Sequence, residues 1–232
     1  MTLSRRLALS SVRFGFGRNL IVNDLSLILD SGEIIALLGP NGSGKSTVLN
    51  LIAGMLHPQQ GSIYYGEFPL HSIRPHRASR LGIAYLMQGG VVFPNLTVEQ
   101  NLAFAQSRGS SARLHPLPET LRKSYPLASL LKRRAGLLSG GERQTLAISM
   151  VVAQNPRVLL LDEPVAGLSE ELSTATAELI TSMCKQSGCS AIIAEHNLTF
   201  ASSINATCYQ LGTNDGVPSA VRVSQPRGDL AR

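Results

Sequence analysis

Two kinds of hydrophobic pattern occur along the chain. Residues 34–38 and 158–161 form short, wholly apolar runs, IIALL and VLLL. Runs of this length without a polar interruption are typical of strands buried on both faces of a parallel sheet. Residues 1–33 and 61–70 instead alternate between apolar and polar positions, as in VRFGF, LSLIL and SIYYG. This second pattern predicts antiparallel strands that form a smaller β lobe.

The stretch between these strands has a different character. Residues 89–157 read as helical, with a loop rich in Ser, Gly and Pro at 107–118. From Gly212 onward the chain is polar and contains Pro and Gly, so we expect a tail that frays. The patterns predict a single α/β domain over residues 1–232. Its parts are a core with a β lobe at 1–88 and 158–211, a helical insert at 89–157 and a polar tail at 212–232.

The composition fits a folded protein, with 44% hydrophobic and 16% charged residues. No apolar run approaches the roughly 18 residues needed to span a bilayer. The N-terminus, MTLSRRLALSSVRF, has only a short, broken apolar stretch, so we expect no secretory signal peptide. The three cysteines show neither C-x-x-C pairing nor metal-ligand spacing, which indicates reduced thiols in a cytosolic protein.

Positive charge is concentrated in one segment. The net charge is +6, and residues 70–134 hold ten Lys and Arg against two Glu, so this segment is +8 and the rest about −2. A basic segment suggests nucleic acid, an acidic partner or an anionic membrane surface, and a solvated basic face is an equally good interpretation. Few aromatic residues lie among the charges, which counts against single-stranded nucleic acid. The basic residues are Arg74, Arg77, Arg80, Arg108, Arg113, Arg122, Lys123, Lys132, Arg133 and Arg134.

The strongest motif is GPNGSGKST at residues 39–47, between the apolar run at 34–38 and an apolar helix ending near Gly54. It matches the phosphate-binding loop pattern in the strand–helix context that this motif requires. Glycines let backbone N–H groups curl around a phosphate chain, and the helix N-terminus adds partial positive charge. Lys45 is expected to reach the β- and γ-phosphates, and Ser46 to bind Mg²⁺. We expect nucleotide contacts from Gly39, Pro40, Asn41, Gly42, Ser43, Gly44, Lys45, Ser46 and Thr47.

A carboxylate pair follows the second apolar run, in VLLLDEP at 158–164. Asp162 is expected at the carboxyl end of a central parallel strand, where α/β proteins place their ligands. Two adjacent carboxylates there would be costly without a cation. With Mg²⁺ present, Asp162 can serve the metal while Glu163 polarises a water for attack on the γ-phosphate.

A third motif, LSGGERQ, occupies residues 138–144. Ser139 is a good helix N-cap, and one glycine would suffice for a tight turn. Two adjacent glycines cost conformational entropy, so the stretch needs a reason beyond starting a helix. A Ser-Gly-Gly turn at a helix N-terminus is a second anion site, and we expect it to grip a nucleotide from the opposite face, across an interface.

The three motifs in this order resemble the ATP-binding subunit of an ATP-binding-cassette (ABC) transporter. The resemblance covers about residues 5–212, and LSGGERQ is close to the signature motif of that family. It implies a P-loop NTPase core, a mostly parallel sheet flanked by helices, with an antiparallel β lobe and an inserted α-helical subdomain. In this family two cassettes pair head to tail, and each ATP lies between one subunit's phosphate loop and the other's signature.

The resemblance also implies roles for single residues. Gln88, in YLMQGG, matches the Q-loop glutamine that approaches Mg²⁺ and the attacking water, and His196, in AIIAEHN, matches the switch histidine that senses the γ-phosphate. Phe16 falls where the family has an aromatic that stacks on adenine, with Phe14 and simple core packing as alternatives. The implied γ-phosphate contacts of the partner's ATP are Ser139, Gly140 and Gly141. The implied catalytic residues are Lys45, Gln88, Glu163 and His196, and the implied Mg²⁺ ligands are Ser46, Gln88 and Asp162.

One position departs from the family pattern. Ser169 replaces the usual D-loop aspartate, in VAGLS at 165–169. It can still N-cap the next helix, whose first turn holds Glu170 and Glu171. The departure puts in doubt the coupling between subunits that the aspartate supports.

By resemblance, the chain is an ATPase subunit that lacks a membrane span and lies on the cytoplasmic face of the membrane. The implied partners are a second cassette, a separate permease and an extracytoplasmic solute-binding protein, with no nucleic acid. VVFPNLTVEQNL and AGLS look most like importers of the branched-chain amino-acid and urea type. An export ATPase, a soluble ABC protein of repair or translation and a nucleotide-gated binding protein are the alternatives.

Overall fold

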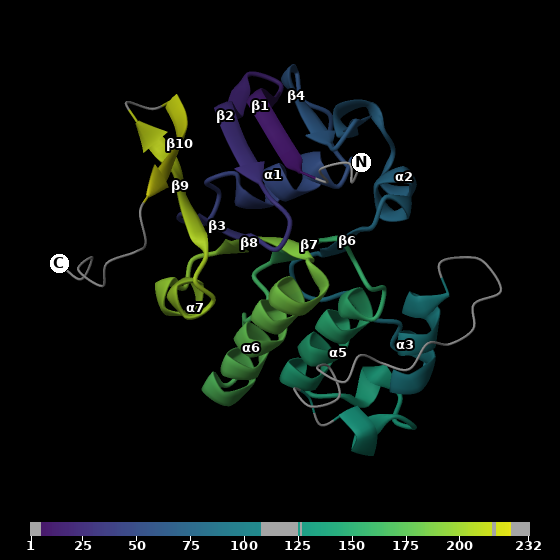
Figure 1. Cartoon of the computed structure of the whole chain (residues 1–232). Coiled ribbons are helices and arrows are strands. Elements are labelled where there is room, and N and C mark those ends of the chain that lie inside the picture. The colour runs from purple at the N-terminus through teal and green to yellow at the C-terminus, as the bar shows by residue number, and fades with distance from the viewer. Residues whose placement is uncertain (1–5, 108–124, 126, 215–216, 224–232) are drawn as a thin grey trace.

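The computed structural model describes residues 6–107, 125, 127–214 and 217–223. It contains two sheets (Figure 1). The smaller, antiparallel sheet has the strand order β2-β1-β4-β5 and confirms the predicted β lobe. Its strands are β1 (Leu7–Phe16), β2 (Asn19–Leu29), β4 (Gln60–Tyr65) and β5 (Phe68–Pro69).

The larger sheet has the order β10-β9-β3-β8-β7-β6, and the pairs from β9 to β6 are parallel. Both apolar runs lie at its centre, and every residue of β3 and β7 is buried, as predicted. Parallel strands need cover on both faces, which is why these strands contain no exposed position. The strands are β3 (Ile34–Leu38), β6 (Ile83–Leu86), β7 (Val158–Asp162), β8 (Ser190–Glu195), β9 (Thr207–Asn214) and β10 (Val217–Val223).

Two hydrophobic cores cover the two faces of this sheet. Along β3, Ile35 and Leu37 pack into one core with α1 (Lys45–Ile52) and the β lobe, whereas Ala36 and Leu38 pack into the other. The second core includes helices α5 (Gly140–Val152), α6 (Glu170–Ser187) and α7 (Leu198–Ser203), which lie below the sheet in Figure 1. The α/β architecture predicted from the sequence is confirmed.

The predicted helical insert contains α3 (Val98–Gln106), two 3₁₀ turns (Leu127–Leu130 and Ala135–Leu137) and α5. A further helix, α2 (Pro75–Arg80), and a 3₁₀ turn (Leu70–Ser72) connect the β lobe to β6. Most of the loop predicted at 107–118, and four of the ten basic residues (Arg108, Arg113, Arg122 and Lys123), lie outside the described residues. In the described part of the chain, every helix is too short or too polar to cross a bilayer.

The end of the chain differs from expectation. Gly212 lies within β9, and β10 pairs antiparallel with it from Val217↔Asn214 to Val223↔Cys208, so the predicted fraying tail is wrong up to Val223. The hairpin satisfies backbone groups that β9 would otherwise present at the sheet edge. The side chains of β10 are all partly or fully exposed, so the strand depends mainly on its backbone pairing with β9. Residues 224–232 lie outside the described residues.

Candidate functional site

The phosphate loop (residues 39–47) runs from the end of β3 into α1. Gly44 caps α1 in the left-handed conformation (φ 94°), and Gly42 is also left-handed (φ 80°). At Gly39 (φ 151°) a Cβ atom would lie 2.3 Å from the Leu211 carbonyl oxygen. These glycines are therefore required by the shape of the backbone. The N-cap of α1 makes no side-chain cap hydrogen bond, so the first N–H groups of this helix are not satisfied by a cap.

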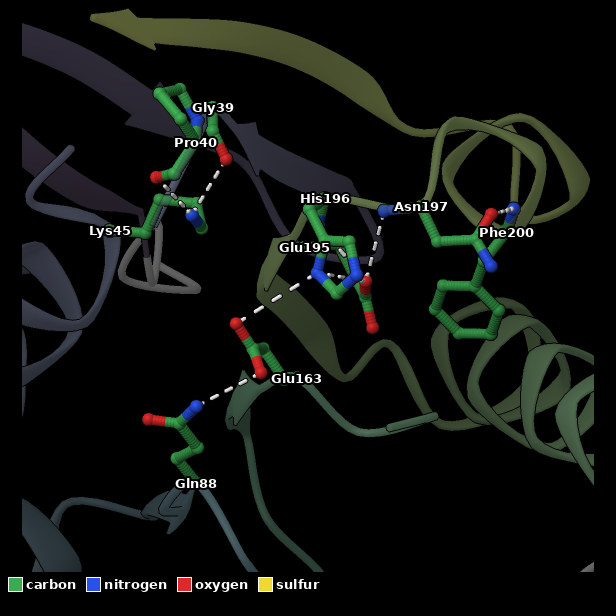
Figure 2. A network of polar contacts seen from close by, with 9 residues as sticks. All are labelled: Gly39, Pro40, Lys45, Gln88, Glu163, Glu195, His196, Asn197 and Phe200. Atoms are coloured by element: carbon green, nitrogen blue, oxygen red, sulfur yellow. Dashed lines mark hydrogen bonds and ion pairs between the residues drawn. The ribbon is translucent and has the colours of Figure 1, made fainter. Parts of the chain in front are cut away.

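The Lys45 ammonium is held against this loop. Its Nζ donates to the carbonyl oxygens of Gly39 (2.8 Å) and Pro40 (2.9 Å), as Figure 2 shows. The residue is buried, and this burial lowers the pKa of the ammonium, while the carboxylates of Glu163, then Asp162 and Glu195, act in the opposite direction. The charge is thus fixed beside the helix N-terminus, facing the acidic end of β7 and β8.

Asp162 ends β7 with its carboxylate buried. Burial raises the pKa of this carboxyl group, and the nearby Ser46 hydroxyl opposes that rise. Oδ2 accepts a 3.4 Å hydrogen bond from the Tyr85 hydroxyl, whereas the buried Oδ1 has no protein partner. A partnerless carboxylate oxygen beside a serine hydroxyl suits a hard cation such as Mg²⁺. Among the described residues, no group of three or more His, Cys, Asp and Glu is arranged to hold a metal ion, so such an ion would need hydroxyl, amide or phosphate ligands too.

Glu163 follows directly in a strained conformation (φ 48°), as is common for residues that act at functional sites. Its backbone N–H donates to the Ala194 carbonyl (3.0 Å), which ties it to β8. Gln88 Nε2 donates to Glu163 Oε2 (3.0 Å), and His196 Nδ1 lies 3.9 Å from Oε1. The side chains of Gln88 and His196 therefore both converge on the Glu163 carboxylate (Figure 2).

The loop that carries His196 is held by Glu195, a residue that was not predicted from the sequence. Glu195 is 1% exposed, and its Oε2 accepts the backbone N–H groups of His196 (3.0 Å) and Asn197 (3.2 Å). Asn197 in turn caps α7, because its Oδ1 accepts from Phe200 N (3.0 Å; Figure 2). Burial raises the pKa of the Glu195 carboxyl group. The available signal was an acidic residue at the end of a fully buried strand, directly before the histidine.

The signature turn (Ser139–Gly141) starts α5 as predicted. The Ser139 hydroxyl accepts from Glu142 N (3.2 Å), and Ser139 N donates to Glu142 Oε2 (2.7 Å), which completes a capping box. The backbone hydrogen bond from Ser139 lowers the pKa of the Glu142 carboxyl group. A Cβ on Gly140 would meet nothing within 4 Å, and one on Gly141 would reach only Leu168 and Leu172 at 3.8 Å. Neither glycine has a positive φ.

The two glycines are therefore not explained by the fold of the single chain. Among the described residues, no hydrogen bond or ion pair joins the signature turn to the phosphate loop. The structure thus brings together Lys45, Asp162, Glu163, Gln88 and His196, and it leaves the signature turn outside that cluster.

A second residue outside the sequence predictions links the parts of the site. Gln144 is buried on α5, and its Nε2 donates to the carbonyl of Pro164 (2.9 Å), directly after Glu163. At Gly90, which follows Gln88 in the Q-loop, a Cβ would lie 2.6 Å from Gln144 Oε1. The helix that begins at the signature turn is therefore packed against both loops that carry Gln88 and Glu163.

Phe16 and Ser169 are the two remaining positions singled out from the sequence. Phe16 is 57% exposed at the end of β1 and contacts Phe14 edge-on (5.0 Å between centroids), whereas Phe14 is 8% exposed. Only Phe16 offers a free ring face. Ser169 caps α6, with its hydroxyl accepting from Leu172 N (3.3 Å) and with Glu170 and Glu171 in the first turn, as predicted.

Comparison with known proteins agrees with this arrangement. Residues 22–166 match the family model described as ABC transporter. A protein of Archaeoglobus fulgidus named as a branched-chain amino acid transport ATP-binding protein, LivF, is 35% identical over 192 residues, 82% of this chain and 81% of that protein. A protein of Salmonella typhimurium named as a 2-aminoethylphosphonate import ATP-binding protein, PhnT, is 34% identical over 183 residues, 78% of this chain. The chain spans about half of that second relative, 48% of its length.

The fold has a close counterpart among solved structures. The ADP conformation of an ATP-binding cassette of an ABC transporter matches with a TM-score of 0.75 at 25% identity, over 94% of this chain and 91% of that chain. The family model covers well over half of the chain, and its matched region contains the phosphate loop, the signature turn and the carboxylate pair. The chain belongs to the ABC transporter family as one of its ATP-binding cassettes, a class of ATPase coupled to transport.

Proposed function

We propose that this chain binds ATP on the phosphate loop and hydrolyses it at Glu163 to power a separate permease. The observation that carries the proposal is the convergence of Gln88 and His196 on Glu163, next to Lys45 and the start of α1. A phosphate chain would be bound by three features together: the glycine-rich loop, the N-terminus of α1 and the ammonium of Lys45. The exposed ring of Phe16 would stack on the adenine.

Mg²⁺ would be held by Ser46, Gln88 and Asp162, together with phosphate oxygens. The partnerless Oδ1 of Asp162 beside Ser46 supports this assignment. When bound, the ion would neutralise charge that develops on the phosphate oxygens during hydrolysis.

Glu163 is the group that would orient the attacking water and take up its proton. The hydrogen bond from Gln88 holds one carboxylate oxygen, and His196 lies near the other. We infer that His196 would contact the γ-phosphate and Gln88 the attacking water. Both side chains would then couple the presence of nucleotide to the loops that carry them.

The signature turn would complete the site of a second cassette. Its two glycines serve no need of the isolated chain, since their Cβ positions are open and their φ angles are ordinary. Bare backbone at a helix N-terminus suits the γ-phosphate of an ATP bound to a partner. Ser139, Gly140 and Gly141 would thus act in a head-to-tail dimer.

The transport role extends this assignment to partners outside the chain. We infer that the dimer attaches to a permease on the cytoplasmic face of the membrane and serves import with an extracytoplasmic solute-binding protein. LivF is named for transport of branched-chain amino acids and PhnT for import of 2-aminoethylphosphonate, so the two names give different solutes. LivF matches over most of both chains, which supports an amino acid or similar small solute. A permease gene and a solute-binding-protein gene beside this one would support import, and an exporter gene there would contradict it.

The enzymatic proposal is tested with Lys45→Ala. Losing a charge-assisted phosphate contact costs about 1.5–3 kcal/mol, so ATP affinity should fall by at least about tenfold and hydrolysis should be lost. Affinity is measured with a fluorescent nucleotide and turnover by phosphate release, on one purified sample whose folding is checked by circular dichroism. Near-normal turnover in the folded variant would overturn the proposed function.

A further inference from the structure

Strand β6 and the loop that follows it contribute two side chains to the carboxylate pair at the end of β7. The Tyr85 hydroxyl donates to Asp162 Oδ2 at 3.4 Å, and three residues later, beyond the end of β6, the Gln88 amide donates to Glu163 Oε2 at 3.0 Å. One short segment therefore supplies a separate hydrogen bond to each of two adjacent acids. The family resemblance implies a role for Gln88, and the Tyr85 hydroxyl is not among the groups for which it implies one.

The strand register explains how Tyr85 reaches this position. Tyr85 is in register with Leu160, and Asp162 lies two residues further along the parallel strand β7, on the same face. The Tyr85 ring packs into the core that contains α1, the helix that begins at the phosphate loop, whereas its neighbour Leu86 belongs to the opposite core. A side chain as long as tyrosine spans the two-residue offset, so only its terminal oxygen meets the carboxylate.

The chemistry of the contact fixes the direction of the hydrogen bond. A tyrosine hydroxyl carries its proton at neutral pH and an ionised carboxylate can only accept, so the Tyr85 hydroxyl donates to Asp162. The carboxylate then has one oxygen, Oδ2, turned to the tyrosine and the other, Oδ1, buried without a protein partner. Hydrogen bonds to a metal-ligating carboxylate set its orientation and tune its affinity.

We propose that Tyr85 is a positioning residue that orients the Asp162 carboxylate, so that Oδ1 is presented to Mg²⁺. This inference rests on the proposed function, in which Asp162 is a ligand of that ion. It concerns the hydroxyl alone, because the aromatic ring is accounted for by its packing in the core.

The test is Tyr85→Phe, which removes one oxygen and keeps the ring. ATP affinity is measured with and without Mg²⁺, and Mn²⁺ affinity of the ATP complex by electron paramagnetic resonance. Substituting the partner of a metal ligand costs about 10–100-fold in metal affinity, and the long 3.4 Å contact places this case near tenfold. We expect the gain in ATP affinity on adding Mg²⁺ to shrink by that factor, with affinity in its absence unchanged.

Two further variants make the outcome specific. Tyr64→Phe removes a hydroxyl from the exposed face of the β lobe and should leave both measurements unchanged. Asp162→Asn should abolish most of the metal dependence, and Tyr85→Phe in that background should have no further effect. An unchanged Mn²⁺ affinity in Tyr85→Phe, with the loss present in Asp162→Asn, would overturn the role of Tyr85 alone. Full metal dependence in Asp162→Asn would overturn the metal site itself, and the role of Tyr85 with it.

Discussion

The phosphate loop and the signature turn are both glycine-rich starts of helices, but only one is explained by its own chain. In the phosphate loop, Gly42 and Gly44 adopt left-handed conformations, and Gly39 has no room for a side chain. In the signature turn, neither Gly140 nor Gly141 has a positive φ, and a Cβ would fit at both positions without a clash. The fold of the chain therefore requires the glycines of the phosphate loop but not those of the signature turn.

The surroundings of the two regions differ in the same way. Beside the phosphate loop lie Asp162 and Glu195, each with a buried oxygen that has no protein partner. The signature turn has a completed capping box instead, with Glu142 paired to Arg133 at 3.9 Å. In the proposed function, half of the catalytic site lies within the chain. The other half is a stable helix start that would act only across an interface.

The largest expected effect comes from removing the proposed base beside the phosphate loop while leaving the signature turn intact. Glu163→Gln keeps the size of the side chain and removes the base, so hydrolysis should fall at least about a hundredfold while ATP binding is retained. Trapped ATP should then hold two subunits together, because the signature turn is untouched. Turnover is followed by phosphate release and association by light scattering.

Association with a different cassette must be excluded before the result is interpreted, so the variant is examined as a single purified species. Turnover within a few-fold of the unmodified chain would show that Glu163 is not the base.

A smaller effect should follow from loosening the loop that carries His196. Glu195→Ala leaves two backbone N–H groups without their acceptor, and the resulting shift of His196 should lower turnover roughly tenfold with ATP affinity retained. Glu195→Gln keeps one acceptor oxygen and should recover most of the activity. If Glu195 acts through His196, adding Glu195→Ala to His196→Ala should change little, whereas multiplied losses would show an independent role.

The smallest expected effect compares two serine caps. Ser139→Ala and Ser169→Ala should each lower the free energy of unfolding by about 1 kcal/mol, because each hydroxyl accepts one N–H at the start of a helix. Only Ser139→Ala should also weaken ATP-dependent association. Urea unfolding gives the first quantity and light scattering in the Glu163→Gln background the second. Equal association of the two variants would remove Ser139 from the trans site.

The sequence predicted the parts of the molecule in which local pattern and chemistry coincide. The apolar runs of β3 and β7 are central strands, and the motif at 39–47 joins a strand to a helix. Contacts between residues far apart in the sequence were not predictable. Tyr85 reaches Asp162 because of the register between β6 and β7. Glu195 is recognisable as the acceptor of two loop N–H groups only once the loop is folded. Strand β10 was not predicted because its stability depends on pairing with β9, which the local sequence pattern does not show.

The central claim, that the signature turn acts on the nucleotide of a partner, is tested most directly by Gly141→Asp in the Glu163→Gln background. A carboxylate about 4 Å from a γ-phosphate charge is repelled by roughly 4 kcal/mol at an effective dielectric of 20, enough to prevent dimer closure. Gly141→Ala, whose Cβ has room within the chain, is the control for folding and for ATP affinity of the monomer. Light scattering at saturating ATP and Mg²⁺ should find a dimer for Glu163→Gln and a monomer with normal ATP affinity after Gly141→Asp. A dimer that persists with Gly141→Asp would contradict the account.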